Sequence, residues 1–279
     1  MIRIFLLFVT AIVFFTFSLY WIISENLKPL LNVVSFEVVS KNKELGENPV
    51  MLKIAVVGDT HTEADQQGYQ VLEKVLSNVK EHQPDLLLFV GDYTESPRSV
   101  VNLVEHRKKL VDIVTAYNAS PSAFVLGNYE SWSDPDEWLR QFQFKEAIIL
   151  ENEVVVLNLG KSEICLRGLG DYYTKRFRYI DFPHECKTLP QITITHDPAG
   201  AFHPSARGLF ISGHTHCGQV SLPFIGPLWV PTEAPKEAYC GLYQDNKRTV
   251  FTTSGVGTTV LPLRFGTQAN WDLLTVQFK

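Results

Sequence analysis

The feature that most constrains this sequence is a repeated junction in which a short apolar run ends at a glycine and an oxygen-bearing side chain. The junction occurs at Gly58-Asp59, Gly91-Asp92 and Gly127-Asn128. The runs before it, residues 53–57, 86–90 and 123–126, are short and rich in aliphatic side chains, which is typical of buried strands. Because ligand sites in open α/β sheets form at the carboxyl ends of strands, the three junctions predict one shared site.

Helical patterns separate these runs. Residues 69–80 and 100–117 place apolar side chains at helical spacing. Strand–helix–strand units of this kind predict right-handed crossovers and a largely parallel sheet. The second half contains short strand-like runs with few helices between them, at residues 147–150, 154–159, 164–169, 192–195, 209–212, 239–243, 249–253 and 273–278. Two packed sheets flanked by helices, an α/β fold, accommodate this order best.

The N-terminus predicts a membrane anchor. From Ile4 to Ile23 the chain is apolar except for Thr10, Thr16 and Ser18, and twenty helical residues span about 30 Å, the thickness of a bilayer core. A cleaved signal peptide and a buried core helix are the alternatives, but the run is long for the first and apolar on every face for the second. We therefore expect a transmembrane anchor at 1–23, a connector at 24–49 and a catalytic domain at 50–279.

Charge and composition indicate the side of the membrane on which that domain lies and the partners that it can bind. Arg3 and the amino group precede the apolar run, whereas Glu25 and Lys28 follow it. This count favours a cytoplasmic N-terminus and an external or periplasmic domain on a single-pass inner-membrane protein, although Lys41 and Lys43 oppose this orientation. Apolar residues make up 45% of the 279 residues, enough for a buried core, and the net charge is -5. The absence of a basic stripe argues against a nucleic-acid partner.

Histidines complete a set of metal ligands. Asp59 and His61 are two residues apart, so they point the same way in an extended segment, and His214 and His216 repeat this spacing. His196 follows another strand-like run. Carboxylate, carboxamide and imidazole ligands together suit Mn, Fe, Zn or Ni better than calcium. Each motif alone is commonly a turn or a core histidine, but their order along the chain predicts a centre for two divalent metal ions.

At these residues the sequence resembles the calcineurin-like metallophosphoesterase superfamily. The resemblance extends over residues 53–278 and is closest at residues 212–227, 239–243 and 255–265, which are similar to membrane-associated YkuE-like phosphohydrolases and to some UDP-2,3-diacylglucosamine pyrophosphatases. It implies a four-layer α/β/β/α sandwich, here with an N-terminal transmembrane helix. It also implies one metal at Asp59, His61 and His216, a second at Asn128, His196 and His214, and Asp92 bridging both.

The resemblance further implies hydrolysis of a phosphodiester, pyrophosphate or phosphomonoester by a hydroxide that bridges two metal ions. Asn128 and His196 would belong to the catalytic set. Where the family usually has Gly-Asn-His-Asp/Glu, this chain has Tyr129, whose phenol has an ordinary pKa near 10 and is a poor proton donor. Tyr129 either limits the enzyme to good leaving groups or is a structural aromatic. A scaffold that lacks catalysis and binds a protein partner is the rival function, but the ligand set is complete.

Two further features lie beside the histidines. The loop Ser221–Pro231 carries Phe224 and Trp229, and we expect it to form an apolar lip that receives a lipid-linked substrate or meets the lipid bilayer. For the aromatic segment 132–144 we expect core packing. Cys217 stands where the subgroup usually has glycine, and we expect a small side chain there rather than a ligand or a redox-active thiol. The four cysteines permit disulfides or buried thiols, and their spacing does not pair them.

Overall fold

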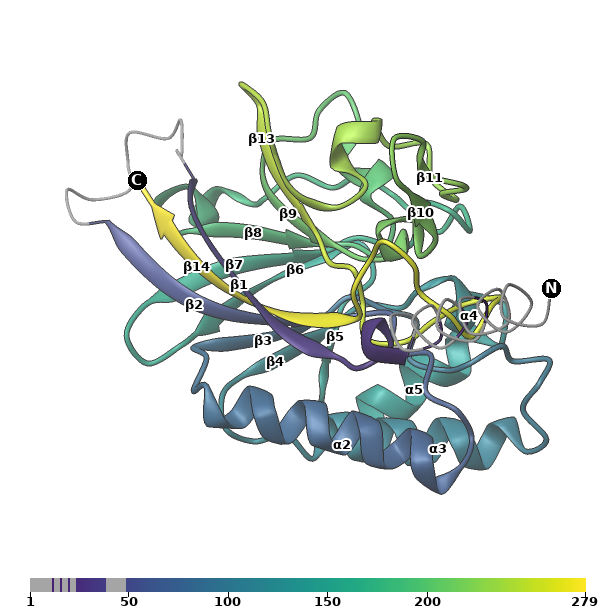
Figure 1. Ribbon diagram of the computed structural model, residues 1–279. Coiled ribbons are helices and arrows are strands. Elements are labelled where there is room, and N and C mark those ends of the chain that lie inside the picture. Colours follow the sequence, from purple (N-terminus) through teal and green to yellow (C-terminus); the bar gives the residue numbers. More distant parts are fainter. Residues whose placement is uncertain (1–11, 13–15, 17–19, 21–23, 39–48) are drawn as a thin grey trace, which may run out of the picture.

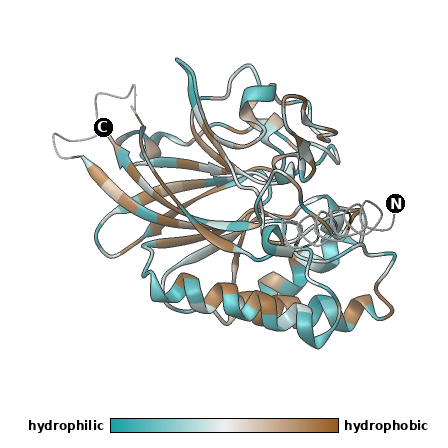
Figure 2. Cartoon of the chain, viewed as in Figure 1, coloured by the Kyte–Doolittle hydropathy of each residue, from teal (hydrophilic) through white to brown (hydrophobic). Residues whose placement is uncertain are grey.

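The computed structural model describes Ile12, Thr16, Tyr20 and residues 24–38 and 49–279. Two six-stranded sheets pack face to face, and helices cover the outer face of the first sheet (Figure 1). Aliphatic side chains of both sheets fill the space between them, among them Ile54, Leu88, Ile192 and Leu274. In Figure 2, brown (hydrophobic) stretches accordingly recur along the strands. The predicted α/β fold with two packed sheets is confirmed.

The first sheet is mixed. Its order is β1 (Leu30–Val38), β14 (Asn270–Phe278), β2 (Val50–Val57), β3 (Leu86–Phe89), β4 (Ser122–Phe124) and β5 (Ile148–Ile149). Strands β2 to β5 are parallel, as the strand–helix–strand pattern predicts, whereas β14 runs antiparallel to β2 and parallel to β1. The segment expected to be a connector, 24–49, therefore contains an edge strand. Its amphipathic sequence buries Phe36 and Val38 in the core.

Four α-helices follow the early strands: α2 (Gln66–Glu81), α3 (Leu103–Thr115), α4 (Asn128–Ser131) and α5 (Pro135–Phe144). The side chains of Asp65, Asn102 and Asp134 cap α2, α3 and α5 by accepting backbone N–H bonds. In α5, Trp138 and Phe142 are buried, so core packing is confirmed for them, but Trp132 and Phe144 at the two ends of the segment are exposed.

The second sheet has the order β12 (Gly241–Gln244), β13 (Arg248–Thr252), β9 (Gly208–Ser212), β8 (Gln191–Ile194), β7 (Glu163–Gly168) and β6 (Glu153–Asn158). Its outer face is covered by the 3₁₀ turns η1 (His184–Thr188) and η2 (Pro198–Phe202) and by the loop before η1. In the part of the chain that the structure describes, this outer layer contains 3₁₀ turns and no α-helix, whereas the expected fourth layer was α-helical. Prolines and glycines in these connections, such as Pro183, Pro198 and Gly200, disfavour longer helices.

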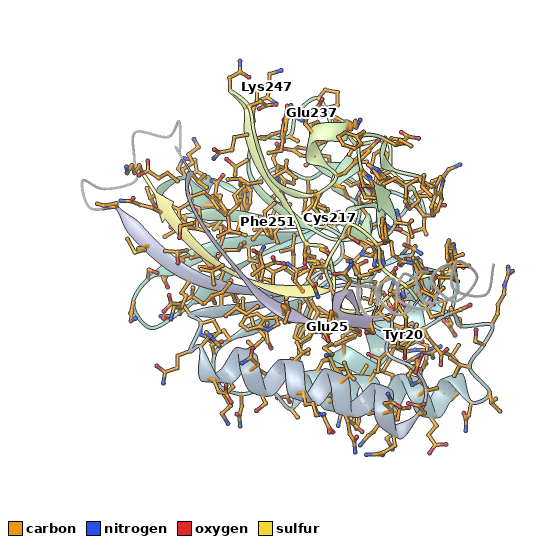
Figure 3. All side chains as sticks on the ribbon, viewed as in Figure 1. Tyr20, Glu25, Cys217, Glu237, Lys247 and Phe251 are labelled. Atoms are coloured by element: carbon orange, nitrogen blue, oxygen red, sulfur yellow. A yellow bond between two sulfur atoms is a disulfide. The ribbon has the colours of Figure 1, made fainter. Side chains whose placement is uncertain are left out.

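The four cysteines form two disulfides. Cys165 of β7 is joined to Cys186 of η1, and Cys217, labelled in Figure 3, is joined to Cys240. Cys217 is therefore part of a cross-link, and the expectation of a small side chain without a partner was wrong. Because Cys217 directly follows His216, this disulfide ties the segment after His216 to the segment before β12.

The expected anchor, Ile4–Ile23, lies outside the described residues except for Ile12, Thr16 and Tyr20. Among the helices that the structure does describe, none combines the length and the apolarity needed to cross a membrane.

Candidate metal centre

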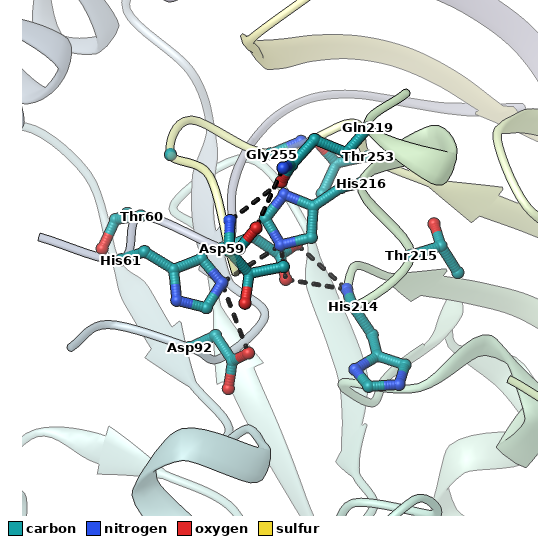
Figure 4. Close-up of polar contacts among 12 residues, drawn as sticks. Asp59, Thr60, His61, Asp92, His214, Thr215, His216, Gln219, Thr253 and Gly255 are labelled. Atoms are coloured by element: carbon teal, nitrogen blue, oxygen red, sulfur yellow. Dashed lines mark hydrogen bonds and ion pairs between the residues drawn. The ribbon is translucent and has the colours of Figure 1, made fainter. Parts of the chain in front are cut away.

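The predicted ligands meet where the carboxyl ends of the two sheets adjoin (Figure 4). Asp59, Asp92 and Asn128 follow β2, β3 and β4, and the histidines follow β2, β8 and β9. Five of these residues have a positive φ, which is uncommon outside glycine: Asp59, His61, Asp92, His214 and His216. Strained backbone of this kind gathers at functional sites, where the surrounding structure holds it in place.

The side chains form two groups. Asp59, His61 and His216 make one, Asp92, His196 and His214 make the other, and within each group the potential ligand atoms lie within 4.8 Å of one another. Asn128 joins the second group, with Oδ1 3.0 Å from Nε2 of His196.

Asp92 stands between the two groups. Its Oδ2 lies 3.5 Å from Nε2 of His61 and 3.4 Å from Nε2 of His196. Asp92 approaches Gly127 so closely that a Cβ at residue 127 would lie 2.2 Å from Oδ1 and 2.5 Å from the backbone nitrogen of Asp92, which explains the glycine before Asn128. The structure thus brings all seven predicted ligands together.

The hydrogen bonds of the histidine rings leave ligand atoms that can bind metal cations. Nδ1 of His196 lies 2.7 Å from the carbonyl oxygen of Val90, and Nε2 of His214 lies 2.7 Å from that of Pro231. Each carbonyl can only accept, so these outer nitrogens donate. With both rings neutral, the inner nitrogens of His196 and His214 would turn lone pairs toward each other at 3.2 Å, an arrangement that a metal ion between them stabilises and that a proton on His196 stabilises in its place. Such outer hydrogen bonds are usual for histidine ligands.

Burial sets the charge states of the first group. It lowers the pKa of His61 to about 4 and that of His216 well below its usual value, so both imidazoles are neutral, as metal ligands must be. Burial also raises the pKa of Asp59 to about 7. A buried carboxylate of this kind is stabilised by a nearby cation.

The second group differs because it holds an ion pair. Burial opposes the charge of Asp92, but the positive charge and hydrogen bond of His196 lower the pKa of this carboxyl to about 2. In the same pair, burial opposes protonation of His196, whereas Asp92 raises the pKa of His196 well above its usual value. Asp92 is therefore an anion positioned between both groups of ligands.

Glu130 is a residue whose role sequence analysis missed. Its buried carboxylate accepts backbone N–H bonds from Asp92 at 2.9 Å, Tyr93 at 2.8 Å, Thr94 at 3.3 Å and Gly127 at 2.9 Å. Glu130 thereby fixes the two loops that carry Asp92 and Asn128. The available signal was its place after Gly127-Asn128-Tyr129, at the position where the motif of the resembled family has Asp or Glu, but the motif does not show what this acid binds.

Arg264 was also missed. Its guanidinium is fully buried, donates to the carbonyl oxygens of Ser254 and Gly257 at 2.7 Å each, and lies 3.1 Å from Nδ1 of His216. Because Gly255 of this loop packs against Asp59, Arg264 holds the loop that backs the first group.

Tyr129 lies at the rim of the centre. Its ring meets the ring of His61 edge-on with centroids 4.6 Å apart, and its hydroxyl is hydrogen-bonded to Oγ1 of Thr259. Burial raises the pKa of the Tyr129 phenol further above its ordinary value. The phenol is therefore a poorer acid here than in solution.

The predicted apolar loop is exposed. Strands β10 (Ser221–Leu222) and β11 (Gly226–Pro227) form a small hairpin, and the side chain of Phe224 at its turn is fully exposed while Trp229 just after it is 62% exposed. The loop at Val260 and Leu261, also exposed, is tied to the base of this hairpin by the side chain of Gln219. We refer to the exposed side chains of Phe224, Trp229, Val260 and Leu261 as the apolar rim; the segment that carries Trp229 reaches the centre two residues later, where Pro231 is bonded to the ring of His214.

Comparisons with known proteins agree with this geometry. A family model described as calcineurin-like phosphoesterase matches residues 52–218, more than half of the chain. The chain is 28% identical over 225 residues to the uncharacterized metallophosphoesterase YkuE of Bacillus subtilis, covering 76% of this chain and 74% of that one. It is 23% identical over 218 residues to the phosphodiesterase YaeI of Escherichia coli, covering 76% and 77%.

A vertebrate relative is similar too. The transmembrane protein with metallophosphoesterase domain of Danio rerio is 26% identical over 245 residues, covering 81% of this chain but 53% of its own length. The family implies two divalent metal ions, and the two ligand groups provide for them. On the family match and the two ligand groups, this chain is a metal-dependent phosphoester hydrolase that belongs to the calcineurin-like phosphoesterase family.

Proposed function

We propose that the chain hydrolyses a phosphodiester, pyrophosphate or phosphomonoester bond, with Asp59, His61 and His216 holding one metal ion and Asn128, His196 and His214 the other. The observation that supports this most is the position of Asp92, whose carboxylate lies within 3.5 Å of a histidine from each group. Two divalent ions bound here would supply a nucleophile from water and neutralise charge on the phosphoryl group.

The protein's own residues orient these parts. Glu130 and Arg264 fix the loops that carry the ligands. Carbonyl oxygens of Val90 and Pro231 set the ring orientations of His196 and His214. The hydroxyl of Tyr129 can donate one hydrogen bond to a phosphoryl oxygen if it leaves Thr259, but its raised pKa disfavours proton transfer to a leaving group.

Asp92→Asn tests this function, because it removes the charge and keeps the acceptor for the N–H of Tyr129. We expect hydrolysis of a bis-aryl phosphodiester to fall at least about 100-fold and bound metal to decrease, with the unfolding midpoint of the metal-free protein little changed. Asp181→Asn, the same change on an exposed loop, is the control. Wild-type turnover by a folded, metal-depleted Asp92→Asn protein would overturn the proposal.

A lipid-linked phosphate ester is the substrate class we propose. The apolar rim of Phe224, Trp229, Val260 and Leu261 is exposed next to the ligand loop, and each acyl methylene buried there contributes about 0.8 kcal/mol. Replacing Phe224 and Trp229 by serine should therefore reduce the preference for an acylated over a deacylated substrate. Phe144→Ser, an equally exposed aromatic on α5, should leave that preference unchanged. Equal efficiency of wild type on both substrates, below their micelle concentrations, would refute the lipid link.

We also propose that the domain lies on the external side of the inner membrane, anchored through residues 1–23. Two disulfides support this side, since they persist in oxidising compartments, and the charges around the apolar run agree. Reporter fusions at the C-terminus test the side directly, with one reporter that is active only in the periplasm and one that is active only in the cytoplasm. Activity of the cytoplasmic reporter alone would place the domain on the cytoplasmic side and contradict the proposal.

A further inference from the structure

A continuous arc of aromatic side chains borders the metal centre. It begins at His61 and continues through Tyr129, Trp132 and Tyr173 to His214, with successive ring centroids 4.6, 5.3, 6.2 and 4.8 Å apart. Trp132 is 58% exposed and Tyr173 is 42% exposed. These two residues come from the end of α4 and from the loop after β7, so two separate segments place flat apolar faces at the border of the metal centre.

The arc leads into a pocket. The pocket has a volume of about 540 Å³ and is lined by Tyr172, Tyr173, Lys175, Phe177, Asp197 and Glu233, with Pro231 and Thr232. It adjoins the centre because Pro231 accepts the hydrogen bond of His214 and the ring of Tyr173 lies against that of His214. The lining combines aromatic rings with carboxylates and one ammonium group, whereas the exposed side chains at Phe224, Trp229, Val260 and Leu261 carry no charge.

The loop that forms this pocket is held in place before any ligand binds. Buried Asp171 accepts hydrogen bonds from the backbone N–H groups of Tyr173 and Thr174 and from the hydroxyl of Thr174. Arg176 forms a two-pronged ion pair with Glu151 at 2.5 and 2.7 Å. A platform fixed in this way loses little conformational entropy when a ligand is bound.

The geometry points to a subsite for a sugar ring attached to the phosphate, stacked on Trp132 and Tyr173 and hydrogen-bonded by polar groups of the pocket. A sugar has a flat apolar face for the aromatic rings and hydroxyl donors for carboxylates such as Glu233. A second phosphate suits the pocket less well, since Asp197 and Glu233 outnumber Lys175. The ring could belong to a hexose or to the ribose of a nucleoside. This inference rests on the proposed hydrolysis and specifies its substrate.

Three p-nitrophenyl phosphodiesters test the subsite, with methyl, hexose-6-yl or nucleoside-5′-yl as the second ester group. All three release the same nitrophenol, so they differ in the group that occupies the subsite. We expect wild-type kcat/KM to be higher for one or both sugar-bearing esters than for the methyl ester. Trp132→Ala and Tyr173→Ala should each reduce this ratio about 3- to 10-fold, mainly through KM, whereas Tyr173→Phe and the remote Phe144→Ala should preserve it.

Binding provides a readout that does not depend on turnover. In a Trp229→Phe background, methyl glucoside or thymidine should alter the tryptophan fluorescence of the metal-free protein, Trp132→Phe should abolish that change, and Tyr173→Ala should weaken the binding. The more effective of the two ligands identifies the source of the ring. The subsite would be refuted if wild type hydrolysed all three esters with no preference for a sugar and if the two alanine variants lost the same fraction of kcat/KM on every ester. The proposed function would stand in that case. If none of the esters is hydrolysed, the proposed function itself fails.

Discussion

At the scale of single residues, Glu130 shows how one carboxylate organises the site. Burial and the neighbouring charge of Asp92 raise the pKa of Glu130 to about 7, although four backbone N–H groups favour its anion. Glu130→Gln would set an amide N–H against one of those donors. We expect a loss of about 2–4 kcal/mol in unfolding free energy and weaker metal binding, measured by urea unfolding and by metal content after dialysis. Glu73→Gln, the same change on the exposed face of α2, should alter neither quantity.

Tyr129 is a second residue whose identity has a testable effect. If the missing histidine limits proton donation, Tyr129→His should raise turnover, most strongly on esters with poor leaving groups, by up to about 10²–10⁴-fold. The raised pKa of the phenol agrees with this expectation, and the bond of its hydroxyl to Thr259 gives it a separate structural role. Rates over a leaving-group series measure the effect. An unchanged slope in Tyr129→His, with the same slope in Tyr129→Phe, would show that Tyr129 acts as a structural aromatic.

At the scale of elements, the docking of β1 onto β14 depends on a buried acid. Asn32 and Asn270 donate to Oδ1 of Asp272 at 2.6 and 2.7 Å, and burial raises the pKa of this carboxyl to about 6. The folded state thus holds a proton that the unfolded state has released, so this group's contribution to stability is lost as pH rises from about 4 to 6. Asp272→Asn should lack that loss, gaining up to about 3 kcal/mol over wild type between pH 4 and pH 7.

Urea unfolding at several pH values measures the Asp272 effect, with the exposed Asp181→Asn as the control. Parallel stability curves for wild type and Asp272→Asn would mean that the carboxyl is already ionised at pH 4. The predicted loss would show as a steeper fall of stability with pH in wild type and Asp181→Asn than in Asp272→Asn.

Elements differ in how far the sequence predicts them. Helix α2 and strands β2 to β4 follow from local periodicity and capping, because the same side chains that set the pattern are the ones buried. Strand β1 was missed because few of its side chains are buried and its partner strand lies at the far end of the chain, some 240 residues away. The outer layer of the second sheet was also missed, since isolated 3₁₀ turns carry no period to detect.

The site was predictable in its ligands but not in their supports. Asp59, His61, His214 and His216 lie in short motifs of fixed spacing, which local sequence preserves. Arg264 and the arc of Trp132 and Tyr173 act through contacts between distant segments, and nothing in their immediate sequence distinguishes them from ordinary charged or aromatic residues. Glu130 occupies the acidic position of a known motif, but its bond to Asp92 follows only from the fold. Likewise, the pairing of the cysteines followed only from the fold.

At the scale of the whole molecule, the two disulfides differ in what they connect. Cys165–Cys186 ties β7 to the outer layer of the second sheet, whereas Cys217–Cys240 begins at the residue after the ligand His216. Their sequence separations are 21 and 23 residues, so removing either one should free nearly the same chain entropy in the unfolded state and cost about 2–4 kcal/mol. Each disulfide is therefore a matched control for the other.

We predict that removing the Cys217–Cys240 disulfide weakens metal binding and that removing the Cys165–Cys186 disulfide does not. Replacing Cys217 and Cys240 by serine frees the backbone of the His214–His216 loop, which includes a positive φ at both histidines, and should lower metal affinity at least about tenfold. Replacing Cys165 and Cys186 should lower the unfolding free energy by a similar amount and leave metal affinity close to wild type. Metal content after dialysis against buffered zinc or manganese, measured beside urea unfolding, separates the two effects. Equal metal retention by both double variants would mean that hydrogen bonds alone, such as those of Arg264 and Pro231, suffice to hold the ligand loop.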